Sequence, residues 1–336
     1  MYTLSNLWKL TFFNKNAFFL RHSILGRPGG ASRTKNRVYC KMAARSLNAL
    51  RSLPHSRRML SSSALVEKTH ATIKGRKRFY KLVGVRGVEG AEAGQVAYEV
   101  TLDGRPLRSP GRRPMHFESQ LLASAVALEW DAQISKRGIE PATMPLMSLV
   151  STWIDQTDIG REEVIRNVIK YLHSDTTCYY ADPEMRVLVG RQKEAFESLH
   201  NWLADEWDAP LTATDGVFKV RHPPHSIARI TTMVEALDTA ALTALQCATM
   251  ESKSLVIGLA LVLRCLSPAV AEETSRLEEE FQLEQWGLVE GGHDLDRVAG
   301  TVKLTSTAAF LHLLDGIDGH SKRLKRLRSA LEEFEK

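Results

Sequence analysis

The sequence predicts an α+β protein, with a small N-terminal antiparallel β-containing domain followed by a larger all-α helical domain. Residues 96–102 alternate between apolar and polar side chains, as a half-buried strand does, and the pair Asp103-Gly104 behind them favours a tight turn. From about residue 118 the chain reads as helix after helix, joined by short connections that contain Pro or Gly. A length of 336 residues, 43% of them hydrophobic and 25% charged, suffices for two globular domains.

The first 66 residues differ in composition from the rest of the chain. They contain 12 Lys and Arg and no Asp or Glu, so the remaining body is acidic although the whole chain carries a net charge of +6. An acid-free segment rich in Arg and Ser that can form an amphipathic helix is typical of a mitochondrial transit peptide. We therefore predict a transit peptide over residues 1–60, a linker over 61–77 and a location in the mitochondrial matrix. Met42 is the expected start, which makes residues 1–41 an upstream extension.

The basic segment leaves one alternative open, a basic arm that binds nucleic acid or acidic lipid. Two apolar runs, residues 7–20 and 254–266, are too short to span a bilayer, and the second reads as a buried helix. We expect a monomer that neither binds nucleic acid nor inserts stably into a membrane.

The β-containing domain is expected over residues 78–157. Its first strand is predicted at 78–85, and the glycines of 84–90 are interpreted as a hairpin loop. The strand at 96–102 then turns into a return segment at 105–108, and Pro and Gly residues punctuate a further edge segment that ends near Phe117.

A helix is predicted from about Glu118 to Ser135, and it is apolar nearly all round. One face carries Leu121, Leu122, Ala125, Val126, Leu128 and Ala132, and the other carries Ala123, Ala127, Trp130 and Ile134. Such a helix packs on two sides, so we expect it to bridge the sheet and the helices that follow. Glu129 and Gln133 fall within the first apolar face, where a carboxylate needs a partner or a raised pKa. The structural interpretation is a buried hydrogen-bonded pair that fixes the helix in register.

The helical domain is expected over residues 158–336, after a first helix near the end of the β-containing domain. The predicted helices span residues 145–155, 162–173, 187–207, 226–249, 254–266, 268–287, 295–314 and 321–334. His200 lies on the apolar face of the third of them, and we interpret it as a hydrogen-bonded core histidine.

Signatures of catalysis are scarce in the sequence. No GxxxxGK[ST], GxSxG or HExxH pattern occurs, and the four cysteines include no CxxC pair. The best enzyme candidate is the cluster of Glu290, His293, Asp294 and Asp296, which could hold a divalent ion in a metal-assisted hydrolase. Glycines within the cluster would hold it loosely, and His293-Asp294 also has the form of a helix N-cap. The residues by themselves leave this hydrolase open as the alternative function; the expectation of no enzyme activity, no cofactor and no metal comes from the family resemblance given below.

Charge is distributed unevenly along the helical domain. Residues 272–296 contain nine acidic side chains and one basic side chain, Arg276. Residues 320–328, by contrast, contain five basic side chains. An acidic ridge beside apolar surface would steer a basic partner.

Several short motifs, taken in order, resemble one family. They are Arg78-Phe79-Tyr80-Lys81, Leu102-Asp103-Gly104-Arg105-Pro106-Leu107 with Ser109-Pro110, Leu128-Glu129-Trp130-Asp131-Ala132-Gln133, Met144-Pro145-Leu146 followed by Asp155, and Trp286-Gly287 with Val289-Glu290-Gly291-Gly292-His293-Asp294. Together they resemble the mitochondrial assembly chaperones of the ATP synthase alpha subunit. Ser109 departs from the pattern, since the family often has threonine there.

The resemblance implies a non-enzymatic matrix chaperone. Such a protein binds the free alpha subunit, shields the surface that beta subunits later cover, and assists assembly of the soluble catalytic head. It also marks Glu129, Trp130, Asp131 and Gln133 as a structural signature. We expect the partner contact on the C-terminal helices, with Trp286 as an apolar anchor and Glu290 and Asp294 as a polar rim. The alternatives are a core position for Trp286 and a solvated loop position for Glu290.

Overall fold

In the computed structural model the residues described are 75–89, 96–134, 138–216, 218–289, 291–316 and 318–335. They all belong to the compact unit Leu60–Lys336, one of the two into which the chain divides. The predicted transit peptide at 1–60 and nearly all of the linker at 61–77 lie outside the described residues. The domain boundary expected at residue 157 stays a prediction.

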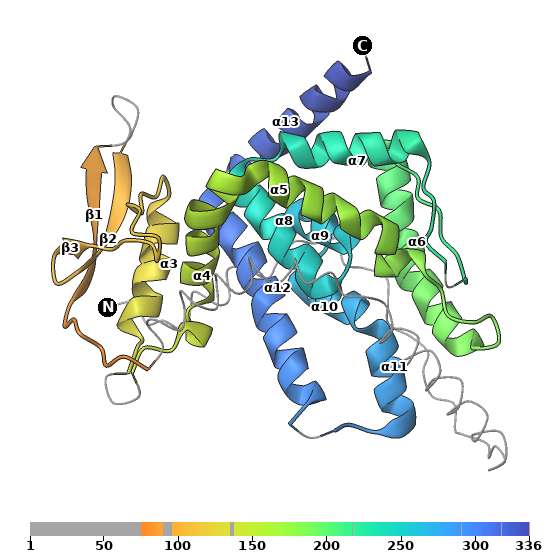
Figure 1. Ribbon diagram of the computed structural model, residues 1–336, viewed down its shortest axis with the longest axis horizontal. Coiled ribbons are helices and arrows are strands. Elements are labelled where there is room, and N and C mark those ends of the chain that lie inside the picture. Colours follow the sequence, from red (N-terminus) through yellow and green to blue (C-terminus); the bar gives the residue numbers. More distant parts are fainter. Residues whose placement is uncertain are drawn as a thin grey trace. The chain divides into compact units, whose positions relative to one another are not determined.

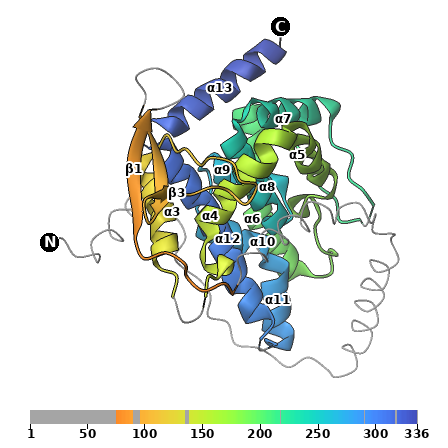
Figure 2. The same cartoon turned by 60° about the vertical axis from the view of Figure 1, so that its left-hand side comes forward.

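A three-stranded antiparallel sheet opens the described part of the chain (Figures 1 and 2). Its strands are β1 (Val83–Glu89), β2 (Val96–Leu102) and β3 (Arg105–Pro106), in the order β1-β2-β3. Asp103 occupies the turn between β2 and β3 with φ +49°, and its carboxylate accepts hydrogen bonds from the backbone of Lys81 and Leu82. The predicted turn is confirmed, and so is the α+β class.

Two of the glycines interpreted as a hairpin loop, Gly84 and Gly87, belong to strand β1 instead, and Gly90 lies outside the described residues. Gly84 pairs with Thr101 and Gly87 with Tyr98 in the β1–β2 ladder. A Cβ on Gly84 would come within 3.1 Å of the Thr101 hydroxyl, so glycine here permits a close cross-strand approach. The prediction was wrong because a glycine pattern alone does not distinguish a loop from a strand with close neighbours.

Helix α3 (Gln120–Asp131) covers the sheet. Its N-cap is Ser119, whose side chain accepts a hydrogen bond from the backbone of Leu122. The helix packs against β1 and β2 and also against α4 (Pro145–Thr152) and α12 (His293–Asp315), which confirms packing on two sides. Leu121 and Leu128, however, are 60% and 66% exposed, so part of the first apolar face is solvated.

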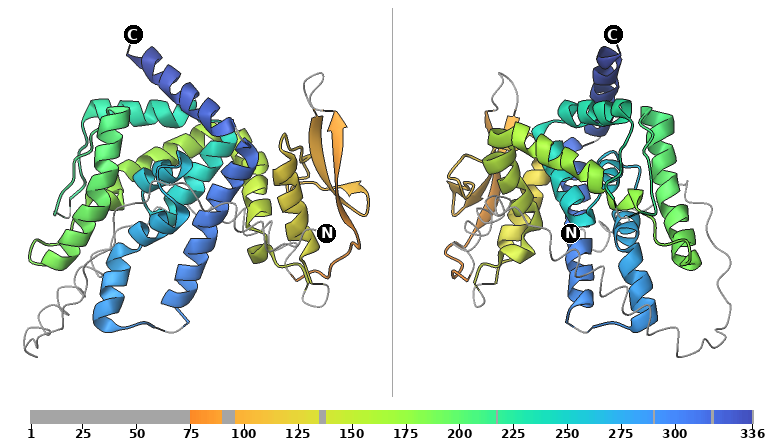
Figure 3. Two further views of the ribbon diagram at one scale, coloured as in Figure 1. Left: turned by 180° about the vertical axis from the view of Figure 1, so that it is seen from behind. Right: turned by 45° about the vertical axis from the view of Figure 1, so that its right-hand side comes forward.

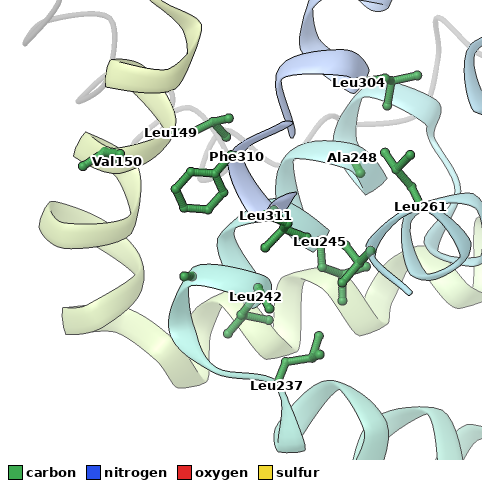
Figure 4. Close-up of a cluster of buried hydrophobic side chains, with 14 of the residues drawn as sticks. Leu149, Val150, Leu237, Leu242, Leu245, Ala248, Leu261, Leu304, Phe310 and Leu311 are labelled. Atoms are coloured by element: carbon green, nitrogen blue, oxygen red, sulfur yellow. The ribbon is translucent and has the colours of Figure 1, made fainter. Parts of the chain in front are cut away.

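The remaining helices form the larger part of the described unit (Figures 1 and 3). They are α5 (Asp158–Lys170), α6 (Arg186–Trp207), α7 (Pro224–Ala236), α8 (Thr239–Ser252), α9 (Leu255–Val262), α10 (Pro268–Ser275), α11 (Leu277–Trp286), α12 and α13 (Gly319–Phe334), with a π-helical turn, Trp153–Thr157, between α4 and α5. Every residue of α9 is buried, and α6, α8, α10 and α12 pack around it. Figure 4 shows side chains of α4, α8 and α12 meeting in this core, among them Leu242, Phe310 and Leu311.

Two helices expected as continuous are each broken in two. The segment 226–249 divides at Asp238, whose carboxylate accepts a hydrogen bond from the backbone of Ala241 and so begins α8. The segment 268–287 divides at Arg276, whose backbone leaves the helical region between α10 and α11. Within the described ranges, no helix combines the length and the apolar character that crossing a bilayer requires.

Candidate functional site

Helices α11 and α12 form an arm at the lower edge of Figure 1, joined by the connection 287–292. No residue of α11 is buried, and the first seven residues of α12 (293–299) are not buried either. Gly287 ends α11 with φ +87°, and Gly291 has φ +74°, two backbone conformations that favour glycine. The arm therefore presents most of its surface to solvent.

Apolar side chains gather on this arm. The tip patch, as we name it, consists of Trp286, Leu288, Val289, Leu295, Val298 and Val302, all exposed. Leu295, Val298 and Val302 recur at the i, i+3 and i+7 positions of α12 and so share one face of that helix. Several large apolar side chains exposed on one arm are typical of an interaction site in a soluble protein.

Trp286 is the largest member of the tip patch. Its side chain is 72% exposed, so the alternative of a core tryptophan is wrong. Tryptophan is enriched among the residues that dominate protein interfaces, because it offers a large rigid surface with a polar edge. Its position fits the role of an apolar anchor.

Arginine–glutamate pairs hold the base of the arm. Arg276 lies 2.6 Å from the Glu279 carboxylate and within ion-pair distance of Glu272 and Glu280. Arg297 on α12 binds Glu280 on α11 with two nitrogens and so ties the two helices together. Three carboxylates thus share two guanidinium groups, so most of their charge is neutralised within the arm.

Two more acids of the predicted ridge have partners on α6. Glu284 binds the Arg191 guanidinium in a bidentate pair at 2.8 and 2.9 Å, and Glu278 accepts a hydrogen bond of 2.7 Å from Gln192. The ridge from 272 to 296 is therefore in large part a set of contacts that fix the arm.

Glu273 on α10 and two acids near the tip form no ion pair with a described residue. Asp294 and Asp296 stand in the first turn of α12, and neither forms an ion pair with a described residue. The positive end of the helix dipole stabilises carboxylates there. One oxygen of Asp294 is buried without a hydrogen-bond partner. Glu290, the other predicted rim residue, lies outside the described residues.

The proposed hydrolase cluster does not converge among the residues that the structure describes. His293 uses Nδ1 to accept a hydrogen bond from the backbone of Val289, at 3.2 Å. Within the described ranges, no three His, Cys, Asp or Glu side chains lie together as a group that could hold a metal ion. Glu290 was the remaining member of that cluster and is not among those ranges.

The signature residue Glu129 connects α3 to α4. Its two carboxylate oxygens accept hydrogen bonds from the backbone of Leu146 and Met147, at 2.8 and 2.7 Å. Met144, the N-cap of α4, provides no capping side chain, so Glu129 does this work from another helix. Burial raises the pKa of the Glu129 carboxyl to about 7, and the two backbone hydrogen bonds oppose this shift.

Gln133 also helps to connect α3 to α4. It is buried, and its amide donates hydrogen bonds to the backbone oxygen of Glu129 and to Thr143 Oγ1, while its Oε1 accepts one from the backbone of Glu140. The expected hydrogen bonding is confirmed. The two side chains do not pair with each other, however: Glu129 binds the backbone of the first turn of α4, and Gln133 binds the segment before it.

Asp131 and Trp130 fix the segment before the sheet. Arg78 donates to the Asp131 carboxylate at 2.9 Å and to its backbone oxygen at 2.7 Å. The Tyr80 hydroxyl donates to the backbone oxygen of Trp130, and the two rings meet edge to face. All four signature residues thus have structural contacts that join the sheet, α3 and α4.

A second buried polar cluster was not predicted. Asp175 is fully buried and accepts four hydrogen bonds, from Thr177 N and Oγ1, Ser254 Oγ and Val256 N. It thereby connects the segment before α6 to the first turn of α9. Its neighbour His200 lies 3.2 Å from Thr177 Oγ1, and burial lowers its pKa, so the interpretation as a core histidine is confirmed. No sequence signal marked Asp175.

Comparisons with known proteins agree with this fold. A family model described as ATP12 chaperone protein matches residues 77–204. The mitochondrial protein atp12 of Schizosaccharomyces pombe is 27% identical over 234 residues, which is 66% of this chain and 79% of that protein.

Two crystal structures are similar over most of the chain. Atp12 from Paracoccus denitrificans has 32% identity and a TM-score of 0.64, covering 71% of this chain and 98% of that one. A candidate chaperone from Agrobacterium tumefaciens has 31% identity and a TM-score of 0.62, with 72% of this chain and 86% of that one covered. The mitochondrial relative agrees with the predicted mitochondrial location.

Proposed function

Because the chain belongs to the ATP12 chaperone family, we propose that it binds the unassembled alpha subunit of mitochondrial ATP synthase in the matrix and assists assembly of the soluble catalytic head. We also propose that it acts by binding alone, without enzymatic chemistry, cofactor or metal. The observation that carries this proposal is the tip patch on the α11–α12 arm.

An unassembled subunit exposes apolar surface that its neighbours later bury, and such surface aggregates. The tip patch offers a complementary apolar surface, and Trp286, its largest member, serves as the anchor. Asp294 and Asp296 lie beside it as free carboxylates, and Glu290 is proposed to complete this rim. An apolar contact with a charged rim fits a partner whose sticky surface is bordered by Lys or Arg.

The size of the patch also suits exchange. A small contact binds tightly enough to prevent aggregation, yet a beta subunit that buries a larger area of the same surface displaces it. The internal ion pairs of Arg276 and Arg297 support this role, because they hold the arm in place without using the tip.

Purification of the tagged chain from matrix extract tests the partner. We expect the alpha subunit to co-purify without beta subunits. Recovery of assembled alpha–beta heads, or of no alpha subunit, contradicts the proposal. The same preparation tests the hydrolase alternative, since bound metal that is lost on His293→Ala would support a catalytic site.

A matched pair of substitutions tests the surface. Val298 in the tip patch and Val187 on α6 are valines with 62% and 63% exposure. We expect Val298→Asp to weaken capture of the alpha subunit about tenfold or more, and Val187→Asp to leave it unchanged. Glu290→Gln should weaken capture while thermal stability stays unchanged. Equal capture by both valine variants would show that the contact lies elsewhere.

A further inference from the structure

Strand β3 and the loop that follows it carry four arginines within nine residues. Arg105, Arg108, Arg112 and Arg113 are all exposed, and we name residues 105–113 the arginine loop. An extended chain rises about 3.3 Å per residue, so three residues separate Arg105 from Arg108 by about 10 Å. The Arg108 guanidinium donates to the backbone oxygen of Arg112, which brings these two positions together.

Asp155 fixes the shape of the arginine loop. Its carboxylate accepts hydrogen bonds from Ser109 Oγ at 2.6 Å and from the backbone of Gly111 at 2.7 Å. A Cβ on Gly111 would stand 2.6 Å from an Asp155 oxygen, so this contact requires glycine. Arg112 is held at φ +64°, a left-handed conformation that is uncommon for an arginine. These contacts fix the conformation of the arginine loop, and its arginine side chains extend from this fixed backbone.

The charges on this loop are unpaired, unlike those of nearby arginines. Arg86 binds Glu99 at 2.9 Å, and Arg78 binds Asp131 at the same distance. Arg105, Arg108 and Arg112, by contrast, form no ion pair with any residue that the structure describes. Arg113 donates to the backbone oxygen of Ile154 and also lacks an ion pair there.

The loop also lies in the basic part of an acidic body. Residues 75–117 contain nine Lys and Arg and four Asp and Glu, whereas residues 118–336 contain 22 basic and 34 acidic side chains. Such a separation of charge orients an approaching partner, because its acidic region is attracted to one part of the molecule and repelled by the other.

We propose that the arginine loop is a second docking surface, separate from the tip patch, and that it binds an acidic segment of a polypeptide partner. Guanidinium groups match carboxylates with two parallel hydrogen bonds, and four of them on one fixed loop suit a run of Glu or Asp. The inference goes beyond the proposed function, because it requires neither the alpha subunit nor the tip patch.

A membrane surface fits these observations less well. The loop's own apolar side chains, Leu107 and Met115 beside it, are 8% and 1% exposed, so none is available to insert among lipids. The acidic helical part of the chain would moreover be repelled by an anionic bilayer or a nucleic acid. An acidic stretch of protein is small enough to contact the loop alone.

The test uses a fluorescent peptide of ten glutamates and measures its binding by anisotropy at low salt. The protein is the unit Leu60–Lys336, compared with the full chain to confirm an equal unfolding midpoint, because the basic residues 1–59 would bind the peptide themselves. The loop variant replaces Arg105, Arg108 and Arg112 by Gln. The control variant replaces Lys322, Lys325 and Arg328, three exposed basic residues of α13, by Gln.

We expect the loop variant to bind the peptide about tenfold more weakly than the wild type, and the control variant to change by less than about twofold. Equal losses in both variants, or no loss in the loop variant, would overturn the proposal. Vesicles of phosphatidylcholine and phosphatidylserine in about a 3:1 ratio form the second arm of the test. Vesicle binding that depends on the loop arginines, with peptide binding that does not, would overturn it in favour of a lipid surface.

Discussion

Glu129→Ala removes the side chain that caps α4 from a neighbouring helix. Two backbone N–H groups, of Leu146 and Met147, lose their acceptor, and Met144 offers no substitute. Both donors are only part-buried, so each costs about 1–2 kcal/mol when unsatisfied, and we expect a loss of about 2–4 kcal/mol at pH 5. For a folded unit of this size that lowers the melting temperature by about 3–7 °C.

The size of this loss should depend on pH. The pKa of the Glu129 carboxyl is about 7 in the folded protein, above its usual 4.5, because burial disfavours the charged form. Between these two values the folded state binds a proton that the unfolded state releases. The stability that this group contributes is therefore present at low pH and is lost as the pH rises through 7, by up to about 3 kcal/mol.

Urea unfolding of the wild type and of Glu129→Ala at pH 5, 6, 7 and 8 measures this effect. The difference between the two proteins should be largest at pH 5 and should shrink to about 1 kcal/mol or less at pH 8. Burial also lowers the pKa of His200 and of His222, but both contribute equally to the two proteins and cancel in the difference. Parallel pH profiles would refute the assignment of this carboxyl.

Two further substitutions test the packing of the fold. Trp130→Arg places a cation at a position that is 3% exposed, and we expect a loss of more than about 4 kcal/mol in thermal unfolding; an unchanged melting temperature would contradict the burial of this residue. Asp315→Asn breaks the pair with Arg323, in which both side chains are at most 4% exposed, and should cost about 3–5 kcal/mol. Glu284→Gln removes the exposed partner of Arg191 and serves as the control, with an expected loss below about 1 kcal/mol. Equal losses of unfolding free energy in Asp315→Asn and Glu284→Gln would show that burial does not determine how much an ion pair contributes to stability.

Much of the fold could be predicted from local pattern. The strand at β2, its turn at Asp103, and the ends of α6 and α13 follow from periodicity and from turn and helix chemistry. The breaks at Asp238 and Arg276 were missed because apolar periodicity continues through them. Aspartate is a preferred N-cap residue, so Asp238 could have been used to predict that a new helix starts there.

The candidate site was predictable only in part. The motif near Trp286 correctly indicated the region of the arm. Whether the Trp286 side chain is buried, however, depends on which distant residues pack against it, and the neighbouring sequence does not reveal this. Glu129 was recognised as a carboxylate in need of a partner. That the partner is the backbone of α4 is a tertiary contact across 17 residues of chain, and residue spacing gives no hint of it.

The central position of α9 has a consequence for how the protein reaches its folded state. Polypeptides are synthesised from the N-terminus, so α6 and α8 emerge before the eight buried residues of Leu255–Val262 against which they pack. Until that late segment arrives, the apolar faces of the earlier helices have nothing to cover them. A member of this chaperone family thus passes through a stage of synthesis in which apolar faces of its own helices are uncovered.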